Sequence, residues 1–122
     1  MKLYKCKECG QVVESINNIS DTNICSEAKR NEIKPFEVDG AKEKHMPVYE
    51  IEGDNITVKV GEVPHPMDDD HFIEFIAYES GNMTLRYKLK PHDEPSCVFP
   101  YVGSGTVYAY CNKHGLWKKD VE

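Results

Sequence analysis

Histidine and cysteine side chains recur in this sequence at positions that could supply ligands to a transition metal. The candidates are His45, His65, His71, Cys111 and His114. A neutral imidazole offers a nitrogen donor and a thiolate offers a soft sulfur donor. Cys111 and His114 are three residues apart, so both can reach one ion from a single tight turn. Taken singly, each histidine is more typical of a solvated loop, and an isolated Cys-x-x-His spacing is weak evidence.

The elements that must position these side chains have the pattern of β-strands. Residues 55–60 and 83–90 alternate polar and apolar, which is the period of half-buried strands. Glycine and asparagine at 53–55 and 80–82 fit hairpin turns. Further strands are expected at 48–52, 71–78, 97–101 and 106–110. No window repeats with the helical period, so the sequence predicts an all-β, immunoglobulin-like antiparallel β-sandwich. The candidate ligands flank these strands, where a rigid sandwich can bring them together.

Composition divides the chain near Lys34. Residues 1–33 hold three of the five cysteines, whereas residues 34–122 hold all five histidines. A piece as short as the first cannot bury a core alone, because chains below about 40 residues generally need a metal or a partner. We therefore expect a small N-terminal segment at 1–33 and a main domain at 34–122.

Charge and hydropathy exclude several classes of protein. The formal charge of −6 disfavours nucleic-acid binding, which needs an excess of Lys and Arg. No apolar run approaches the ~20 residues that span a bilayer, so no membrane association is expected. The start of the chain lacks the apolar stretch of a secretory signal, and we expect a cytoplasmic protein. In that reducing compartment an odd number of cysteines points to metal binding or catalysis rather than to disulfides.

The candidate ligands and their neighbours together resemble the superoxide reductases of the desulfoferrodoxin family. The resemblance covers about residues 40–119 and rests on three signatures: Glu-Lys-His-x-Pro at 43–47, His-Pro-Met at 65–67 and Cys-Asn-x-His-Gly-x-Trp at 111–117. It implies an enzyme that reduces superoxide by one electron to hydrogen peroxide, with electrons from an external donor such as a rubredoxin. It also implies one mononuclear iron (Fe²⁺/Fe³⁺) per chain, four equatorial histidines, and Cys111 as the axial ligand. His114 would bind through the other ring nitrogen from the remaining three.

The same resemblance assigns catalytic roles to Glu43 and Lys44. Glu43 would close the sixth coordination position of ferric iron, and Lys44 would attract superoxide and organise a proton-donating water. A charge about 7 Å from the entering anion contributes roughly 0.6 to 2.4 kcal/mol, depending on the effective dielectric. We further expect a homodimer or homotetramer.

Residues 4–13 resemble the start of the desulforedoxin-type module, which binds iron through four thiolates. Here Cys6, Cys9 and Cys25 stand at ligand positions, but Ser26 takes the place of the fourth cysteine. A serine hydroxyl is much harder to ionise than a metal-bound thiol. We therefore predict that this site is empty or not redox-active, and that the degenerate segment keeps at most a dimerisation role.

Two other classes of function fit parts of the pattern. An electron-transfer cupredoxin uses two histidines, a cysteine and a weak axial methionine, but no methionine follows His114 and two matched histidines would have no role. A non-enzymatic immunoglobulin-like interaction module would bind no metal. Among the remaining residues, we interpret Cys97 as a buried inert thiol, His92 as a surface histidine and Trp117 as packing beside the ligand loop.

Overall fold

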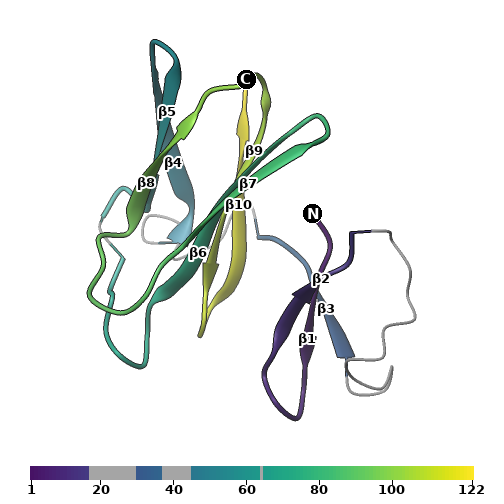
Figure 1. The fold of residues 1–122 in the computed structure, drawn as a ribbon. Coiled ribbons are helices and arrows are strands. Elements are labelled where there is room, and N and C mark those ends of the chain that lie inside the picture. The colour runs from purple at the N-terminus through teal and green to yellow at the C-terminus, as the bar shows by residue number, and fades with distance from the viewer. Residues whose placement is uncertain (17–29, 37–44, 64) are drawn as a thin grey trace. The chain divides into compact units, whose positions relative to one another are not determined.

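The computed structural model describes residues 1–16, 30–36, 45–63 and 65–122. Within these ranges the regular elements are β-strands, and the chain forms two compact units, Met1–Lys34 and Pro35–Glu122 (Figure 1). No helix in the described part of the chain is long and apolar enough to cross a membrane.

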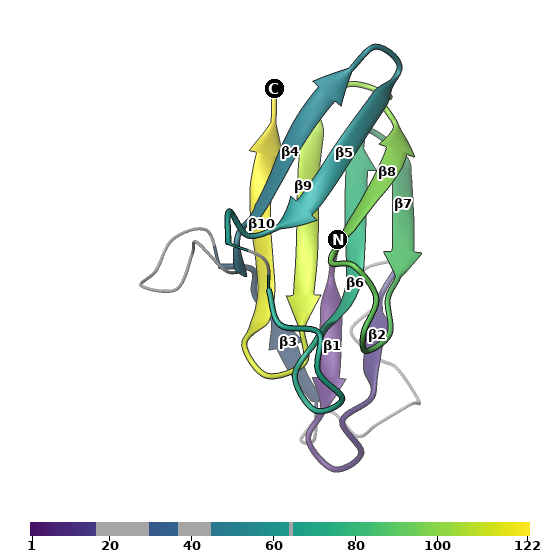
Figure 2. The same ribbon diagram turned by 90° about the vertical axis from the view of Figure 1, so that its left-hand side faces the viewer.

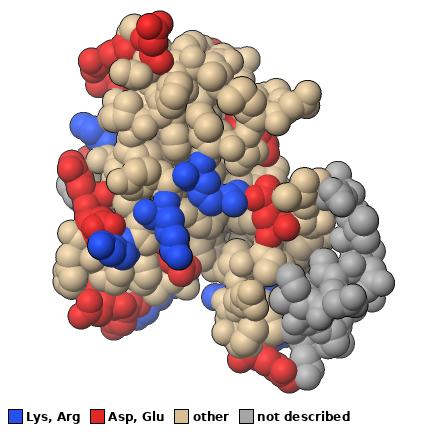
Figure 3. Space-filling model, viewed as in Figure 1, with Lys and Arg blue, Asp and Glu red and all other residues tan. Residues whose placement is uncertain are grey.

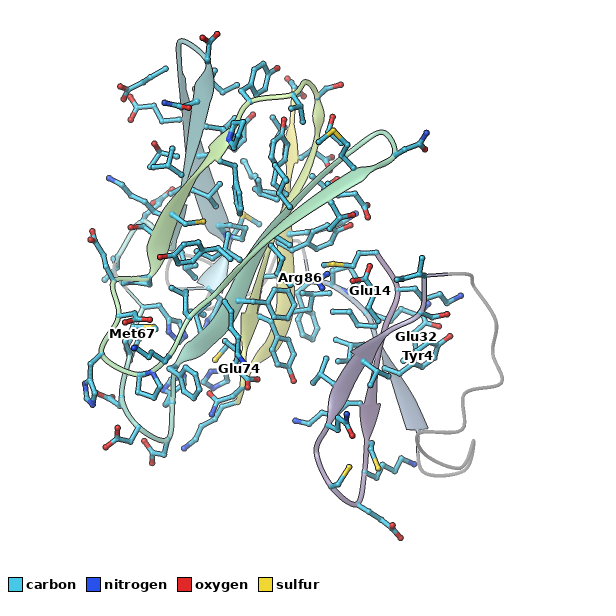
Figure 4. All side chains as sticks on the ribbon, in the orientation of Figure 1. Tyr4, Glu14, Glu32, Met67, Glu74 and Arg86 are labelled. Carbon is cyan, nitrogen blue, oxygen red and sulfur yellow. The ribbon has the colours of Figure 1, made fainter. Side chains whose placement is uncertain are left out.

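The first unit is a small antiparallel sheet. It contains β1 (Leu3–Cys6), β2 (Val12–Glu14) and β3 (Arg30–Ile33) in the order β2-β1-β3. Tyr4 of β1 lies opposite Glu32 of β3, and both are labelled in Figure 4. The sequence did not predict these strands, because runs of three or four residues are too short for an alternating pattern to be read.

The second unit is a sandwich of two antiparallel sheets, as the sequence predicted. One sheet has the order β4-β5-β8, with β4 at Pro47–Glu52, β5 at Asn55–Val60 and β8 at Ser96–Pro100. The other has the order β10-β9-β6-β7, with β6 at Ile73–Ser80, β7 at Met83–Lys88, β9 at Gly105–Cys111 and β10 at Gly115–Val121. Figure 2 shows β4 and β5 lying over the second sheet. Strand β10 is the one element of this unit that the sequence did not predict.

The core lies between the two sheets and uses alternate residues of each strand. Ile56 and Val58 of β5 face inward from one sheet, and Ile76 and Val107 face inward from the other, all with no exposed surface. Cys97 of β8 belongs to this core, and burial raises the pKa of its thiol to about 12, as expected for an inert cysteine.

Close packing between β9 and β6 is strictest at Gly105, the first residue of β9. A Cβ atom added there would lie 1.9 Å from the Glu79 carbonyl oxygen, a distance that no real side chain tolerates. The neighbouring loop is held by side chains of β6: the Tyr78 hydroxyl donates to the Gly103 carbonyl and accepts from the Val102 amide, and Ser80 Oγ donates to the Ser104 carbonyl at 2.6 Å. This end of the sandwich therefore requires glycine at position 105.

We predict that Gly105→Ala destabilises the protein by about 1–3 kcal/mol, the usual cost of forcing extra volume into a packed site. Urea unfolding measures the change. Ser104→Ala is the matched control, because Ser104 is exposed and its carbonyl still accepts from Ser80. Equal stability of the two variants would contradict the close approach of β9 to β6.

Candidate metal centre

One end of the sandwich gathers all five ligand candidates from both sheets. His45 lies just before β4, His65 and His71 lie in the connection from β5 to β6, Cys111 ends β9, and His114 lies in the turn to β10. Their ligand atoms all lie within 4.8 Å of one another. Met67 and Glu74, labelled in Figure 4, mark the same end of the unit. Among the residues described, this is the only group of three or more His, Cys, Asp or Glu that could share a metal ion.

The four imidazole rings form a closed cycle. Successive centroids, in the order His45, His65, His71, His114 and back to His45, are 4.8, 4.9, 4.9 and 4.6 Å apart, and each pair meets at 67–81°. A square of this side has its centre about 3.4 Å from each centroid, which leaves room for a metal–nitrogen bond of about 2.0–2.1 Å to every ring. The cycle therefore has the dimensions of four imidazoles around one ion.

Two buried nitrogens of this cycle have no hydrogen-bond partner among the residues that the structure describes. They are Nε2 of His65 and Nε2 of His71. The other nitrogen of His65, Nδ1, lies 2.7 Å from the Pro66 carbonyl oxygen, which can only accept a hydrogen bond. Nδ1 of His65 therefore carries the proton, and Nε2 presents a lone pair. A buried polar atom without a partner destabilises a fold, and a metal ion bound by these two nitrogens would satisfy both.

His114 presents the opposite ring nitrogen. Its Nδ1 lies 3.0 Å from His45 Nε2 and 3.7 Å from Cys111 Sγ. The cycle thus offers Nε2 from three histidines and Nδ1 from His114, while Cys111 Sγ lies close to the same donor atoms. The resulting donor set, four nitrogens and one sulfur, suits a transition metal and not Ca²⁺ or Mg²⁺, which prefer oxygen.

Burial sets the protonation of the donors. Desolvation lowers the pKa of His65 to about 4 and also lowers that of His71, with neighbouring histidines acting in the same direction. These imidazoles are therefore neutral near pH 7 and free to bind a metal. Desolvation raises the pKa of the Cys111 thiol, against a smaller opposing effect of the Lys113 and His114 amides. Binding of a metal at neutral pH must consequently displace a proton from Cys111.

Aromatic rings support the cycle from outside. Trp117 stacks on His45, with ring centroids 5.1 Å apart and planes at 17°, and Phe36 packs behind Trp117 at 5.1 Å. The Trp117 indole also donates a hydrogen bond to the His114 carbonyl at 3.1 Å. The sequence predicted Trp117 beside the ligand loop but gave no sign of its contact with His45.

Other candidates from the sequence lie away from this centre or outside the description. His92 is exposed, and its Nε2 lies 3.0 Å from Asp69. In the first unit Cys6 is buried and disulfide-bonded, whereas Cys9 is an exposed free thiol. The remaining candidates lie outside the described residues: Glu43, Lys44, Cys25 and Ser26.

Known proteins are similar to this chain in sequence and in fold. The sequence profile named Desulfoferrodoxin matches residues 37–120. This chain belongs to the desulfoferrodoxin family. The desulfoferrodoxin of Syntrophotalea carbinolica is 40% identical over 121 residues, covering 98% of this chain and 96% of that protein. The superoxide reductase of Pyrococcus abyssi is 39% identical over 100 residues, covering 66% of this chain and 87% of that protein.

A solved structure extends the similarity to nearly the whole chain. The crystal structure of the superoxide reductase from Treponema pallidum aligns with a TM-score of 0.77 and 26% identity, covering 97% of this chain and 95% of that chain. Iron is the metal expected in this family. The partnerless nitrogens, the dimensions of the imidazole cycle and the adjacent thiol all fit such an ion.

We predict that metal binding to this protein changes its tryptophan fluorescence. Trp117 is the only tryptophan of the chain, and it stacks on His45. A bound paramagnetic ion such as Co²⁺ or Fe²⁺ should therefore quench the emission until one equivalent has been added. In His45→Ala the stacked ring is absent, and the quenching should be weaker and need more metal. Unchanged emission during stoichiometric binding by the wild type would contradict the geometry.

Proposed function

We propose that this chain is a superoxide reductase whose iron is bound by His45, His65, His71, His114 and Cys111. The observation that carries the proposal is the closed cycle of four imidazoles beside a cysteine sulfur. Membership of the desulfoferrodoxin family and similarity to proteins named superoxide reductase support the reaction.

The protein's own groups suit the charge changes of this reaction. Four neutral imidazoles and one thiolate would reduce the charge of a bound ferrous ion to a single positive charge, and five protein donors would leave a coordination position for the anion. Iron bound by these residues would supply the one electron that each turnover needs, and the Cys111 thiolate would favour its ferric state. His45, His65 and Cys111 are buried, whereas His71 is half-buried and His114 is exposed. The low local dielectric therefore strengthens the electrostatic effect of the three buried ligands, and the cluster is open to solvent at His114.

Glu43 and Lys44 come directly before the proposed ligand His45 in the sequence. We assign Glu43 to the closing of the sixth position in the ferric state and Lys44 to the attraction of superoxide and the delivery of a proton through water. The acidic net charge does not oppose this role, since on-rates depend on the local field. Basic side chains gather over the middle of the sandwich unit in the view of Figure 3, so the charge is unevenly distributed.

Each turnover consumes one electron, and we propose a rubredoxin as the external electron donor. We propose a homodimer or a homotetramer as the assembly. Residues 34–122 would form the catalytic domain, and residues 1–33 a degenerate desulforedoxin-like segment with no redox-active metal. Ser26 at the fourth ligand position supports the second assignment. We also propose a cytoplasmic location, which would keep the Cys111 thiol reduced; the disulfide of Cys6 departs from the free thiols expected in that compartment.

The competing functions account for less of the geometry. A cupredoxin site would leave two of the four imidazoles without a role, and Met67 Sδ already accepts a hydrogen bond from the Ile73 amide at 3.4 Å. An interaction module gives no reason for the partnerless nitrogens of His65 and His71.

We predict that the purified protein contains about one iron per chain and that oxidation produces a visible thiolate-to-iron charge-transfer band. Cys111→Ser should abolish the band, because the sulfur donor is removed. Cys9→Ser is the control, since Cys9 is exposed in the first unit and should leave the band unchanged. Elemental analysis and absorption spectra measure both. A band that survives Cys111→Ser would show that the axial assignment is wrong.

We predict that Lys44→Ala slows the reaction of the reduced protein with superoxide by a few-fold to tens-fold, as an attraction of roughly 0.6 to 2.4 kcal/mol implies. The wild-type rate should fall with ionic strength, because salt screens charges beyond about 10 Å at 0.1 M. Lys44→Arg should retain most of the rate, and Lys59→Ala on β5 should retain all of it. Pulse radiolysis measures these rates, and equal values for Lys44→Ala and wild type would remove Lys44 from the mechanism.

A further inference from the structure

Asn112 occupies the position between the end of β9 and the ligand His114, and its side chain makes two hydrogen bonds to another segment. Asn112 Oδ1 accepts from the Phe72 amide at 3.0 Å, and Nδ2 donates to the Asp70 carbonyl at 3.0 Å. Its own backbone amide donates to the Phe72 carbonyl at 3.2 Å. Asn112 therefore binds the main chain on both sides of His71.

The hydrogen bonds between β6 and β9 do not by themselves connect the backbone at His71 to β9. The pairing of β6 with β9 places Ile73 opposite Cys111, and its register is irregular between Ile73 and Phe75. His71 precedes this last pair, so it lies beyond the regular ladder. Within its own loop, His71 exchanges backbone hydrogen bonds with Asp68 at 2.9 and 3.3 Å, which shape the turn but do not connect it to β9.

The imidazole of His71 needs such support. Its Nε2 is buried and has no hydrogen-bond partner in the part of the chain that is described, and His71 belongs to the cluster whose ligand atoms lie within 4.8 Å of one another. The position of that nitrogen relative to Cys111 follows from the backbone at Asp70 and Phe72. An amide is suited to hold both, because one end of the group accepts and the other donates. Alanine would make neither bond, and aspartate could accept from Phe72 but could not donate to the Asp70 carbonyl.

We infer that Asn112 is a positioning residue that sets the place of the His71 imidazole in the metal centre. The inference rests on the proposed ligand set, and it requires no assumption about the reaction with superoxide. Groups that orient metal ligands from outside typically change affinity by about 10- to 100-fold when removed. Removal of Asn112 should therefore act on the metal site more strongly than on the fold.

Binding of Co²⁺ to the full chain tests the inference without an activity assay. Asn112→Ala should lower the affinity by about 10- to 100-fold, and the visible spectrum of the Co²⁺ protein should shift as the His71 bond lengthens. Ser80→Ala is the matched control: it also breaks a side-chain hydrogen bond to the backbone, at the other end of β6, and should lower thermal stability without changing affinity or spectrum. Asn112→Asp should also lower the affinity, because the carboxylate can accept from the Phe72 amide but cannot donate to the Asp70 carbonyl. Its negative charge would by itself attract the cation, so a loss of affinity cannot come from a loss of attraction to the metal.

The same measurement in His71→Ala separates two routes of action. If Asn112 acts through His71, Asn112→Ala should change the affinity of His71→Ala less than about two-fold, although it changes that of the wild type by about ten-fold or more. An equal fall in both backgrounds would overturn the inference and assign the effect to Cys111 or His114. Wild-type affinity and spectrum in Asn112→Ala would also overturn it. Absence of Co²⁺ binding by the wild type would reject the ligand set itself, whereas failure to reduce superoxide would leave this result intact.

Discussion

The register between β6 and β9 is the constraint on which the metal centre depends. Ile73 lies opposite Cys111, so the chain entering β6 and the chain leaving β9 meet at one end of the same sheet. His71 comes two residues before this pair and His114 three residues after it. A slip of one residue would turn Ile73 and every following side chain to the other face of the sheet. The buried side chains of Ile73, Ile76 and Val107, together with Cys111 in the same core, therefore fix the place of His71 and His114.

Burial of the donors works against the fold until an ion is bound. An unsatisfied buried polar group costs about 1–3 kcal/mol, and His65 and His71 each have such a nitrogen. The same desolvation keeps these imidazoles neutral, which is the form that a metal requires. The features that weaken the protein without metal are thus the features that prepare it to bind one.

The sequence predicted the sandwich and the ligand candidates because both depend on patterns that are local. Alternation identified β5 and β7, and hairpin residues identified their turns. Strand β10 was missed because Leu116 and Trp117 are both buried, which breaks the alternation, and because Lys118 and Lys119 follow directly. The hydrogen bonds of Asn112 to Asp70 and Phe72 join residues about forty positions apart in the sequence, so no local pattern predicts them. The stacking of Trp117 on His45 is hidden for the same reason.

The ligands are supported by different parts of the unit, and this division has a physical consequence. His65 is oriented by the carbonyl of Pro66, His45 by the ring of Trp117, and His71 by the backbone that Asn112 binds. These supports come from a proline carbonyl, an aromatic face and an amide side chain, so no single change removes them all. Because Trp117 contacts His45 and also binds the His114 carbonyl, β10 couples two ligands that are sixty-nine residues apart. Several independent contacts restrict the positions of the ligand side chains more than any single contact could. A site with five protein donors needs ligands that are positioned in this way before the ion binds.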